Sequence, residues 1–387
     1  MLTAMHRTSH LDSLEMGTRP SICIRQRLDI QFGWSYLMKV TWLITQLLCF
    51  LVVGNALAEN SFTKTCPVLQ NRAYYEPILA DPRAAQTSVL FPAVASSFPY
   101  AVNTGSSLAW DISLGAEIPI ISCNNFKSAD DDRLGVPSGK FGVGLWFPIS
   151  FHMIEDMGKD PSNPILNVDY RFSGMIKAQY GIGSSSHLGM KFQFGHESTH
   201  IGDEFTLGAL KAHPNDFLRV NVSYEYYDMG GSFEPNLGKE GRYEIKIRAG
   251  DIWLWNPDHG WYNSDLLQPF GKFIALSNRN HEPYAQAELY VDGGLFRGLI
   301  ASTDIRDRTI YQYVPTSNAQ TKGQPEPTQV SINTDVGWRQ PDSSPGTFGR
   351  VRPTIYIRYY RGVNPNGQFR SQPNFQEFGL GFQFRFW

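Results

Sequence analysis

The chain ends on the stretch EFGLGFQFRFW, residues 377–387, in which large apolar residues alternate with small or polar ones. Successive side chains of a β-strand point to opposite faces, so a strand here would have one apolar face rich in aromatic rings. That face carries Phe378, Leu380, Phe382, Phe384 and Phe386. Trp387 comes directly after Phe386 and therefore belongs to the opposite phase. The chain is therefore expected to close on an amphipathic strand.

The same period of two recurs along the sequence. It is found at residues 108–120, 141–151, 166–178, 188–194, 218–226, 242–250, 330–338 and 351–359. Three more strands are expected near residues 268–277, 284–291 and 295–303, which brings the count from Leu108 to about twelve. Membrane β-barrels made from one bacterial chain have even strand numbers, and a count of twelve agrees with that rule.

A cleavable export signal precedes these segments. Met38 begins the stretch MKVTWLITQLLCFLVVGNALAEN, in which Lys39 is followed by an apolar run and then by Ala56-Leu57-Ala58. A basic residue, an apolar core and an A-x-A site are the three parts of a secretory signal peptide. Residues 38–58 are therefore predicted to be removed after Ala58. Residues 1–37 are predicted to be a non-native extension that a start codon placed too far upstream would explain.

Export and the amphipathic ending together favour an all-β fold, a transmembrane antiparallel β-barrel of about twelve strands over residues 106–387. The chain after Ala58 lacks the roughly 18 consecutive apolar residues of a spanning helix, whereas barrel strands need far fewer. Residues 59–105 are expected to form a periplasmic segment, a plug or an early strand near 86–95. The predicted location is the outer membrane of a Gram-negative envelope. The predicted partners are its lipids and, through Phe378–Trp387, the barrel-assembly machinery.

Charged residues occupy the inward phase of several predicted strands. The lumen-facing candidates are Arg242, Glu244, Lys246, Arg248, Arg352 and Arg358. These charges would either bind a solute or neutralise one another in a closed interior. A structural barrel or a small-solute transport barrel is therefore the function that the sequence favours. The aromatic stretch IWLWNPDHGWY, residues 252–262, is expected at the membrane interface, where aromatic girdles lie.

Composition and charge argue against a nucleic-acid partner. Five of the 34 basic and three of the 36 acidic residues precede the predicted cleavage point, which leaves a net charge of −4 on the exported chain. Phosphate binding needs a basic stripe, and the sequence has none. Cys66 and Cys123 are the two cysteines of the exported chain. They would either pair in an oxidising compartment or remain as separate thiols.

Five segments resemble an uncharacterised bacterial outer-membrane family, domain of unknown function twelve-oh-seven. They are YYEPILADPRAAQ (74–86), NVDYRFSG (167–174), HESTHIGDEF (196–205), YYRGVNPNGQF (359–369) and FGLGFQFRF (378–386). In this order they span nearly the whole exported chain. The resemblance implies an outer-membrane barrel, and it implies no activity because none is established for the family.

The third of these segments contains His-Glu-x-x-His, the zinc-binding signature of many metallopeptidases. That site needs a helix, in which residues i and i+4 lie on one face. Residues 188–194 have the period of a strand, and if the strand continues, His196 and His200 lie roughly 13 Å apart, too far for one zinc ion. Glu197 would point to the opposite face. A zinc peptidase is therefore not expected, and no metal or other cofactor is predicted.

On a strand, His196 and Ser198 share the lipid-facing phase of Phe192 and Phe194. Polar side chains cost free energy in hydrocarbon unless they are partnered. A His-x-Ser pair on an outer barrel wall resembles the catalytic dyads of outer membrane phospholipase A and of lipid A deacylase. There the serine attacks an acyl ester and the histidine accepts its proton. The resemblance implies an alternative function, a membrane-embedded acyl-ester hydrolase with His196 and Ser198 as catalytic residues, for which Ca²⁺ would be the cofactor to test.

Two expectations oppose this alternative. The next strand would present to the lipid the side chains of Leu218, Val220, Val222, Tyr224 and Tyr226. None of these is a carboxylate or amide that could orient the imidazole. With a periplasmic start, His196 would also lie near the inner rim of the barrel. One additional early strand would reverse this, but another strand would then have to be absent to keep the count even. The favoured interpretation is a hydrogen-bonded polar turn at the rim, made of His196, Ser198, His200, Asp203 and Glu204.

Overall fold

The computed structural model describes residues 66, 74–95, 109–124, 136, 138–157, 165–182, 186–203, 206–207, 211, 220–237, 243–255, 261–263, 271–275, 280–315, 328–341, 351–370 and 372–386. The predicted N-terminal extension and signal peptide, residues 1–58, lie outside this part of the chain, as do Glu204 and Arg242. None of the helices in the described part is long and apolar enough to cross a membrane.

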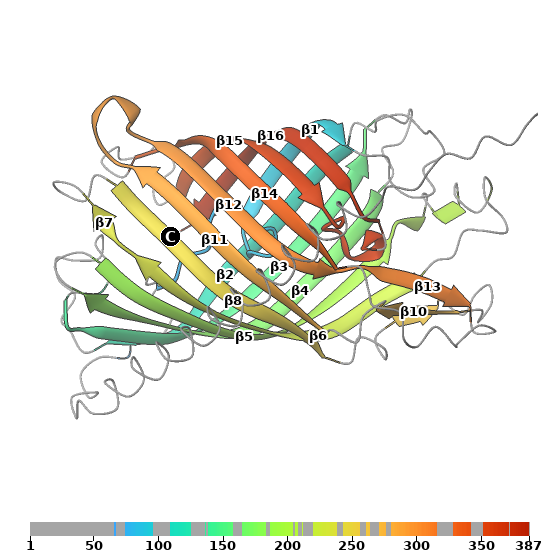
Figure 1. Cartoon of the computed structure of the whole chain (residues 1–387), viewed down its shortest axis with the longest axis horizontal. Helices are drawn as coiled ribbons and strands as arrows, with labels where there is room; N and C mark the ends of the chain where they lie inside the picture. The colour runs from blue at the N-terminus through green and yellow to red at the C-terminus, as the bar shows by residue number, and fades with distance from the viewer. Residues whose placement is uncertain are drawn as a thin grey trace, which may run out of the picture. The chain divides into compact units, whose positions relative to one another are not determined.

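Twelve of the described strands form one closed antiparallel wall (Figure 1). They are β1 (Thr87–Ala95), β2 (Ala109–Asn124), β3 (Phe141–Asp156), β4 (Ile165–Ile182), β5 (Ser186–Ile201), β6 (Val220–Glu234), β8 (Tyr243–Trp255), β11 (His281–Val291), β12 (Leu299–Thr309), β14 (Thr328–Arg339), β15 (Val351–Gly362) and β16 (Phe375–Phe386). The wall closes where β1 pairs with β16, with Val89 opposite Phe382. The predicted fold class, an antiparallel barrel of about twelve strands, is confirmed.

The count of twelve is reached with a different set of strands from the one predicted. Residues 87–95 form a wall strand, whereas β10 (Gly271–Ala275) pairs only with β13 (Tyr311–Pro315) in a separate two-stranded sheet. The prediction of a wall strand near 268–277 is therefore wrong. The prediction fails because β10 has only five residues, whereas a tilted strand needs about nine to cross the bilayer. The short strands β7 (Asn236–Leu237) and β9 (Trp261–Asn263) extend the ends of the wall.

Side chains alternate between the two faces of the wall, as the period of two predicts. On β4, Tyr170, Phe172 and Ile176 are exposed on the outer face, whereas Asp169 and Arg171 are buried in the lumen. On β16 the outer face carries Phe378, Leu380 and Phe384. Trp253 and Trp255, near the end of β8, are exposed on the outer face and fit the predicted aromatic girdle.

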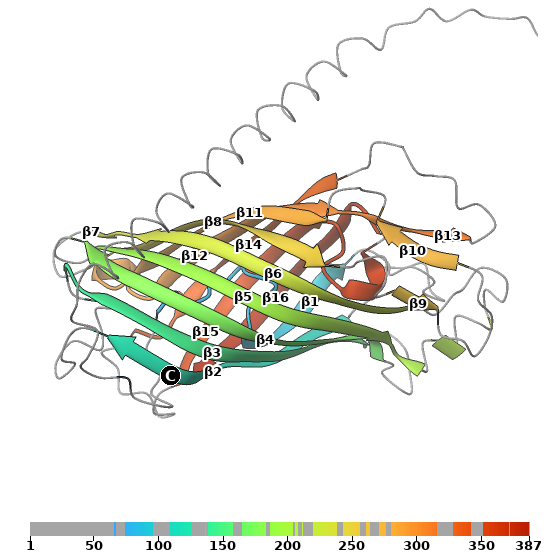
Figure 2. The ribbon, with the colours of Figure 1, turned by 90° about the horizontal axis from the view of Figure 1, so that it is seen from below.

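The two ends of the wall differ in their connections. The C-terminal end carries Phe386 and the connections 125–140, 183–185, 238–242, 292–298 and 340–350. The opposite end, here called the loop end, carries the connections 96–108, 157–164, 202–219, 256–280, 310–327 and 363–374. Strand β5 runs from the C-terminal end toward the loop end (Figure 2). His196 belongs to the last part of β5 and therefore lies near the loop end. The sequence predicted the opposite direction for β5. The wall strand at 87–95 adds one strand before β5 and so reverses its direction, and the absence of a wall strand at 268–277 keeps the total even.

Two segments that are not wall strands enter the lumen. The lumen segment, residues 74–86, precedes β1, and the loop segment, residues 363–370, joins β15 to β16 and contains the 3₁₀ turn η4 (Gly367–Phe369). A second 3₁₀ turn, η2 (Gly294–Phe296), lies at the C-terminal end. Cys66 and Cys123 form a disulfide, which ties the chain before the lumen segment to the end of β2. The sequence had left this pairing and two separate thiols as alternatives.

Candidate functional site

The lumen segment is bound on several sides by inward-facing wall residues. The amide of Leu79 donates to Glu288 Oε2 over 2.7 Å. The Asn333 side chain donates to the carbonyl oxygen of Ala80 over 2.8 Å. Asp81 forms an ion pair with Arg306. These contacts satisfy backbone groups that would otherwise be buried without partners, and they hold the segment in place.

Arg83 of the lumen segment and Arg370 of the loop segment meet on the same wall residues. Arg83 Nη1 lies 3.2 Å from Glu197 Oε2, and Arg83 Nη2 lies 3.6 Å from Glu282 Oε2. Arg370 pairs with Glu282 as well. Both guanidinium groups also donate to the hydroxyl oxygen of Tyr224, over 3.2 and 3.1 Å. One buried network therefore connects the two segments inside the barrel.

Three of the predicted lumen charges, Lys246, Arg248 and Arg358, form ion pairs with carboxylates that the sequence analysis did not single out. Lys246 lies 3.2 Å from Glu76 and 3.5 Å from Glu288. The carboxylate partners of the two buried arginines are Glu234 for Arg248, at 2.9 Å, and Asp335 for Arg358, at 2.8 Å. Glu244 interacts electrostatically with Lys246 and Arg352, and Arg352 also interacts with Glu76. Buried ions need such partners because desolvation is costly.

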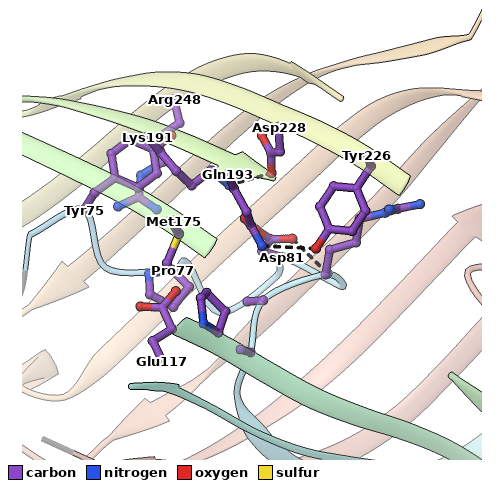
Figure 3. A pocket seen from close by; sticks show the side chains of 14 residues that line it. Tyr75, Pro77, Asp81, Glu117, Met175, Lys191, Gln193, Tyr226, Asp228 and Arg248 are labelled. Atoms are coloured by element: carbon purple, nitrogen blue, oxygen red, sulfur yellow. Dashed lines mark hydrogen bonds and ion pairs between the residues drawn. The ribbon is translucent and has the colours of Figure 1, made fainter. Parts of the chain in front are cut away.

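The cavities within this network are small. One of about 30 Å³ is lined by residues that include Tyr75, Asp81, Lys191, Asp228 and Arg248 (Figure 3). Its charges are paired, since Lys191 Nζ lies 2.6 Å from Asp228 Oδ2. A volume of this size holds one or two water molecules. A second cavity, of about 20 Å³, is lined by residues that include Asp111, His152 and Glu377. These two cavities have room for water rather than for a solute.

The segment with the zinc signature is part of strand β5, which pairs without interruption along both neighbours. His196 and Ser198 lie on the outer face with Phe194, whereas Glu197 and Thr199 are buried in the lumen. The helix that a zinc peptidase site requires is not formed here, and Glu197 serves the lumen network. Across the described ranges, no group of three or more His, Cys, Asp or Glu side chains is placed to hold a metal ion.

The phase predicted for the next strand, β6, is wrong. Tyr224 and Tyr226 are 1% and 5% exposed, and both face the lumen. Their hydroxyl oxygens accept hydrogen bonds there from Arg83 and from Gln193. A tyrosine has an apolar ring and a polar tip, so the arginines and amides of the lumen draw it inward. The outer face of β6 instead carries Ser223, Glu225 and Tyr227. The side chains of Leu218, Val220 and Val222 lie outside those that the structure describes.

Three side chains on the outer face of β5 and β6 form a constellation, here called the wall triad: Ser223, His196 and Glu225. The hydroxyl oxygen of Ser223 lies 3.2 Å from His196 Nε2. The other imidazole nitrogen, Nδ1, lies 3.4 Å from Glu225 Oε1. Strand register sets this arrangement, since His196 pairs with Glu225 and Ser198 with Ser223. A hydroxyl, an imidazole and a carboxylate in this order match the parts of a nucleophilic triad.

Aromatic side chains surround the wall triad, and one of them, Trp255, belongs to the stretch for which an aromatic girdle was predicted. Glu225 pairs with Trp255 on β8, and the Trp255 ring lies 5.9 Å from that of Tyr227. The ring of Phe172 lies 5.1 Å from the imidazole of His196. The His196 and Glu225 side chains are 27% and 41% exposed. An ionisable pair is costly in hydrocarbon, and the cost falls near the interface, where girdle aromatics lie.

The sequence-predicted residues His196 and Ser198 both lie on the outer face, but their hydrogen bonds go to other partners. Ser198 Oγ lies 3.1 Å from His200 Nε2. Asp203 follows the end of the strand and is exposed. Ser223 and Glu225 were missed because the phase of β6 was misjudged. The signal that could have found them is the pattern Ser-x-Glu on the strand that follows His-x-Ser.

A sequence model of one protein family matches residues 52–259, and its description is "Protein of unknown function (DUF1207)". The chain belongs to this family. The match contains the lumen segment and the wall triad of this DUF1207 protein, together with three of the five segments that suggested the family: 74–86, 167–174 and 196–205. The resemblance seen in the sequence is confirmed. A search of curated proteins finds no match to the sequence.

Several solved structures are similar in fold to this DUF1207 protein. One is outer membrane phospholipase A from Escherichia coli, with 10% sequence identity, a TM-score of 0.43, and coverage of 78% of this chain and 92% of that chain. Another is the COG4313 outer membrane channel from Pseudomonas putida F1, with 11% identity, a TM-score of 0.42, and coverage of 82% and 98%. At these values neither likeness bears on activity.

Proposed function

We propose that this protein is a membrane-embedded acyl-ester hydrolase that acts on membrane lipids through the wall triad. The observation that carries the proposal is the geometry on the lipid-facing wall. Ser223 Oγ lies 3.2 Å from His196 Nε2, and Glu225 Oε1 lies 3.4 Å from His196 Nδ1. The function that the sequence favoured, a structural or transport barrel, assigns no role to these three groups. The two segments that enter the lumen also give passage of a solute little support.

The chemistry follows from the roles of the three groups. Ser223 Oγ attacks the carbonyl carbon of an acyl ester, and His196 Nε2 accepts the hydroxyl proton. Glu225 holds the ring orientation and stabilises the imidazolium that forms. The imidazolium then gives its proton to the leaving alcohol, and an acyl-serine remains. Water, deprotonated by the same imidazole, hydrolyses the acyl-serine and regenerates the hydroxyl. The two distances within the wall triad, 3.2 and 3.4 Å, fit a site without substrate, because catalytic hydrogen bonds shorten when the enzyme binds its substrate.

Ser198 completes the site as a hydrogen-bond donor for the oxyanion. It pairs directly with Ser223 across β5 and β6, so the two hydroxyl groups flank one position above the wall. His200 Nε2 lies 3.1 Å from Ser198 Oγ, and in the tautomer with its proton on Nε2 the imidazole donates to this oxygen, so the serine hydroxyl keeps its own proton for the oxyanion. A donor aimed at the developing charge stabilises the tetrahedral intermediate. In this assignment Ser223 is the nucleophile. Ser198, which the sequence predicted as the nucleophile, donates the hydrogen bond to the oxyanion.

The position of the wall triad fits a lipid ester. In outer-membrane barrels the longer loops face outside, so the loop end would face the cell exterior after export and signal cleavage near Ala58. The wall triad would then lie at the outer interface. Lipid ester groups lie at the boundary between the headgroups and the hydrocarbon, which is also the level of the aromatic girdle.

The test compares ester hydrolysis by the refolded exported chain, residues 59–387, with that of Ser223→Ala and of the matched variant Ser198→Ala. The substrates are a phospholipid in mixed micelles and a short-chain ester, each with and without Ca²⁺. Heat-dependent gel mobility confirms that every variant is a folded barrel. We expect Ser223→Ala to lose activity and Ser198→Ala to retain part of it. Loss in Ser198→Ala alone would restore the assignment from the sequence. A folded but inactive wild type would end the proposal.

A further inference from the structure

We infer that the outer wall carries a binding site for the acyl chain of the substrate at Gly174, beside the wall triad, an inference that rests on the proposed function. Gly174 lies in the middle of strand β4 on its lipid-facing side, between Phe172 and Ile176. An added Cβ there would have no other atom of the chain within 4 Å. The wall is therefore open at this position.

The strand itself does not require glycine at this position. Glycine weakens a strand interior and usually marks a bulge, a bend or the close approach of another group. The pairing of β4 with β5 runs through Ser173, Gly174 and Met175 without a register shift, which excludes a bulge. Nor does Gly174 have the positive φ that favours glycine elsewhere in the described part of the chain. We take the close approach of another group as the reason for glycine at this position.

Other strand glycines show what such an approach looks like inside the barrel. A Cβ on Gly195 would lie 2.6 Å from the Tyr226 ring, and one on Gly250 would lie 2.4 Å from the Tyr284 hydroxyl. These glycines face the lumen and make room for a tyrosine of the same chain. Gly174 faces the opposite way, toward the membrane. Since no atom of the chain lies within 4 Å of an added Cβ there, we assign the space to a group from outside the chain.

The side chains around this opening, here called the Gly174 notch, are large and apolar. Phe172 and Ile176 are 48% and 49% exposed and stand roughly 6.6 Å from Gly174 along the strand. Phe194, 41% exposed, pairs with Gly174 across β5. An apolar recess that faces hydrocarbon fits a methylene chain, whereas a charged headgroup would be left there without a polar partner.

The notch lies next to the wall triad and deeper in the membrane. His196 pairs with Phe172, so Gly174 is its diagonal neighbour, with Cα atoms roughly 7–8 Å apart. Strand β4 runs from the loop end toward the C-terminal end, which places Gly174 on the hydrocarbon side of His196. A lipid with its ester at Ser223 would direct its acyl chain along the wall into the notch. The notch therefore selects substrates with long acyl chains.

The test fills the notch with Gly174→Leu. The new side chain has open space, and leucine suits a strand better than glycine, so the barrel should fold. Contact with about two methylenes of the chain would be lost, so kcat/KM on a phospholipid with palmitoyl chains should fall about tenfold. Activity on a butyryl ester should stay within about twofold. The control, Ala301→Leu, adds similar bulk to the outer face of β12, away from the wall triad, and should change neither activity.

Each other result would overturn the inference. Equal losses on both substrates would mean that Gly174 affects the wall triad itself. No loss on either substrate would mean that the notch holds no chain. A change in self-association of the barrel in detergent, with unchanged selectivity, would make a second copy of the chain the occupant. A wild type inactive on both esters would instead reject the proposed function, and so the two failures are distinguishable.

Discussion

Arg83 connects the two segments that enter the lumen, and its replacement by alanine should destabilise the whole barrel. The side chain contacts Glu197 at 3.2 Å, Glu282 at 3.6 Å and the Tyr224 hydroxyl at 3.2 Å. Both carboxylates are almost completely buried. Arg83→Ala would leave each of them with one cation fewer in a region that water hardly reaches.

The expected loss can be worked out from these contacts. Removal of one partner from a buried ion pair costs roughly 3–5 kcal/mol when the other charge is left alone. Here Glu197 retains Arg171 at 3.0 Å, and Glu282 retains Arg370, so the electrostatic cost should be about 2 kcal/mol. The lost hydrogen bond to Tyr224 adds about 1 kcal/mol. The free energy of unfolding should therefore fall by about 3 kcal/mol.

The assay is unfolding of the refolded barrel in detergent micelles by guanidinium, followed by tryptophan fluorescence. The matched control is Arg361→Ala, which removes an exposed arginine from the outer face and should cost less than about 0.5 kcal/mol. Arg83→Ala combined with Glu197→Gln should lose less than the sum of the single losses, because the two residues share one interaction. A loss below about 1 kcal/mol in Arg83→Ala would refute the account of the lumen network.

Three further predictions concern the wall triad, a lumen carboxylate and the disulfide. Glu225→Gln should lower kcat for ester hydrolysis by about 10²-fold without a change in the unfolding midpoint, and an unchanged kcat would remove Glu225 from the mechanism. Burial raises the pKa of Asp81, but Arg306, Lys191 and the hydrogen bonds from Arg83 and Gln286 together outweigh it and lower the pKa from 3.8 to about 2. The resulting stability, about 2 kcal/mol, is present above pH 4 and is lost as the pH falls toward 2. Asp81→Asn should reduce this decrease in the free energy of unfolding at acid pH. An unchanged decrease would mean that other titrating groups cause it. Replacement of Cys66 and Cys123 by serine should cost about 2–4 kcal/mol, measured by the same unfolding assay, and a negligible cost would show that the disulfide is dispensable.

The fold was predictable because the period of two is strong where it matters most. In β16 and β4, large apolar residues hold one phase and charged or small residues the other, so the faces follow directly. The number of strands was predicted correctly although the set was not. Strand β1, residues 87–95, is short and follows a segment that folds into the lumen. Sequence alternation alone does not show whether such a strand belongs to the wall. Residues 271–275 have an alternating pattern but are too few to cross the membrane.

The site was predictable only in part, because tyrosine is compatible with both faces of this wall. The sequence predicted that His196 and Ser198 share one face with Phe192 and Phe194, and the structure has them on that outer face. It failed on β6, where Tyr224 was read as apolar although its hydroxyl binds two lumen arginines. That single error of phase hid Ser223 and Glu225. The partners of Tyr224 come from segments far away in sequence, so local periodicity could not have revealed them.

The most direct measurement is covalent labelling of the folded barrel with a fluorophosphonate ester, followed by peptide mass spectrometry. Such a probe phosphonylates a serine hydroxyl that an adjacent imidazole activates, and it needs no knowledge of the natural lipid. The account predicts one modified serine, Ser223, and loss of the label in His196→Ala, with the barrel folded in both proteins. A folded wild type without label, or a label on Ser198 that persists in His196→Ala, would contradict it.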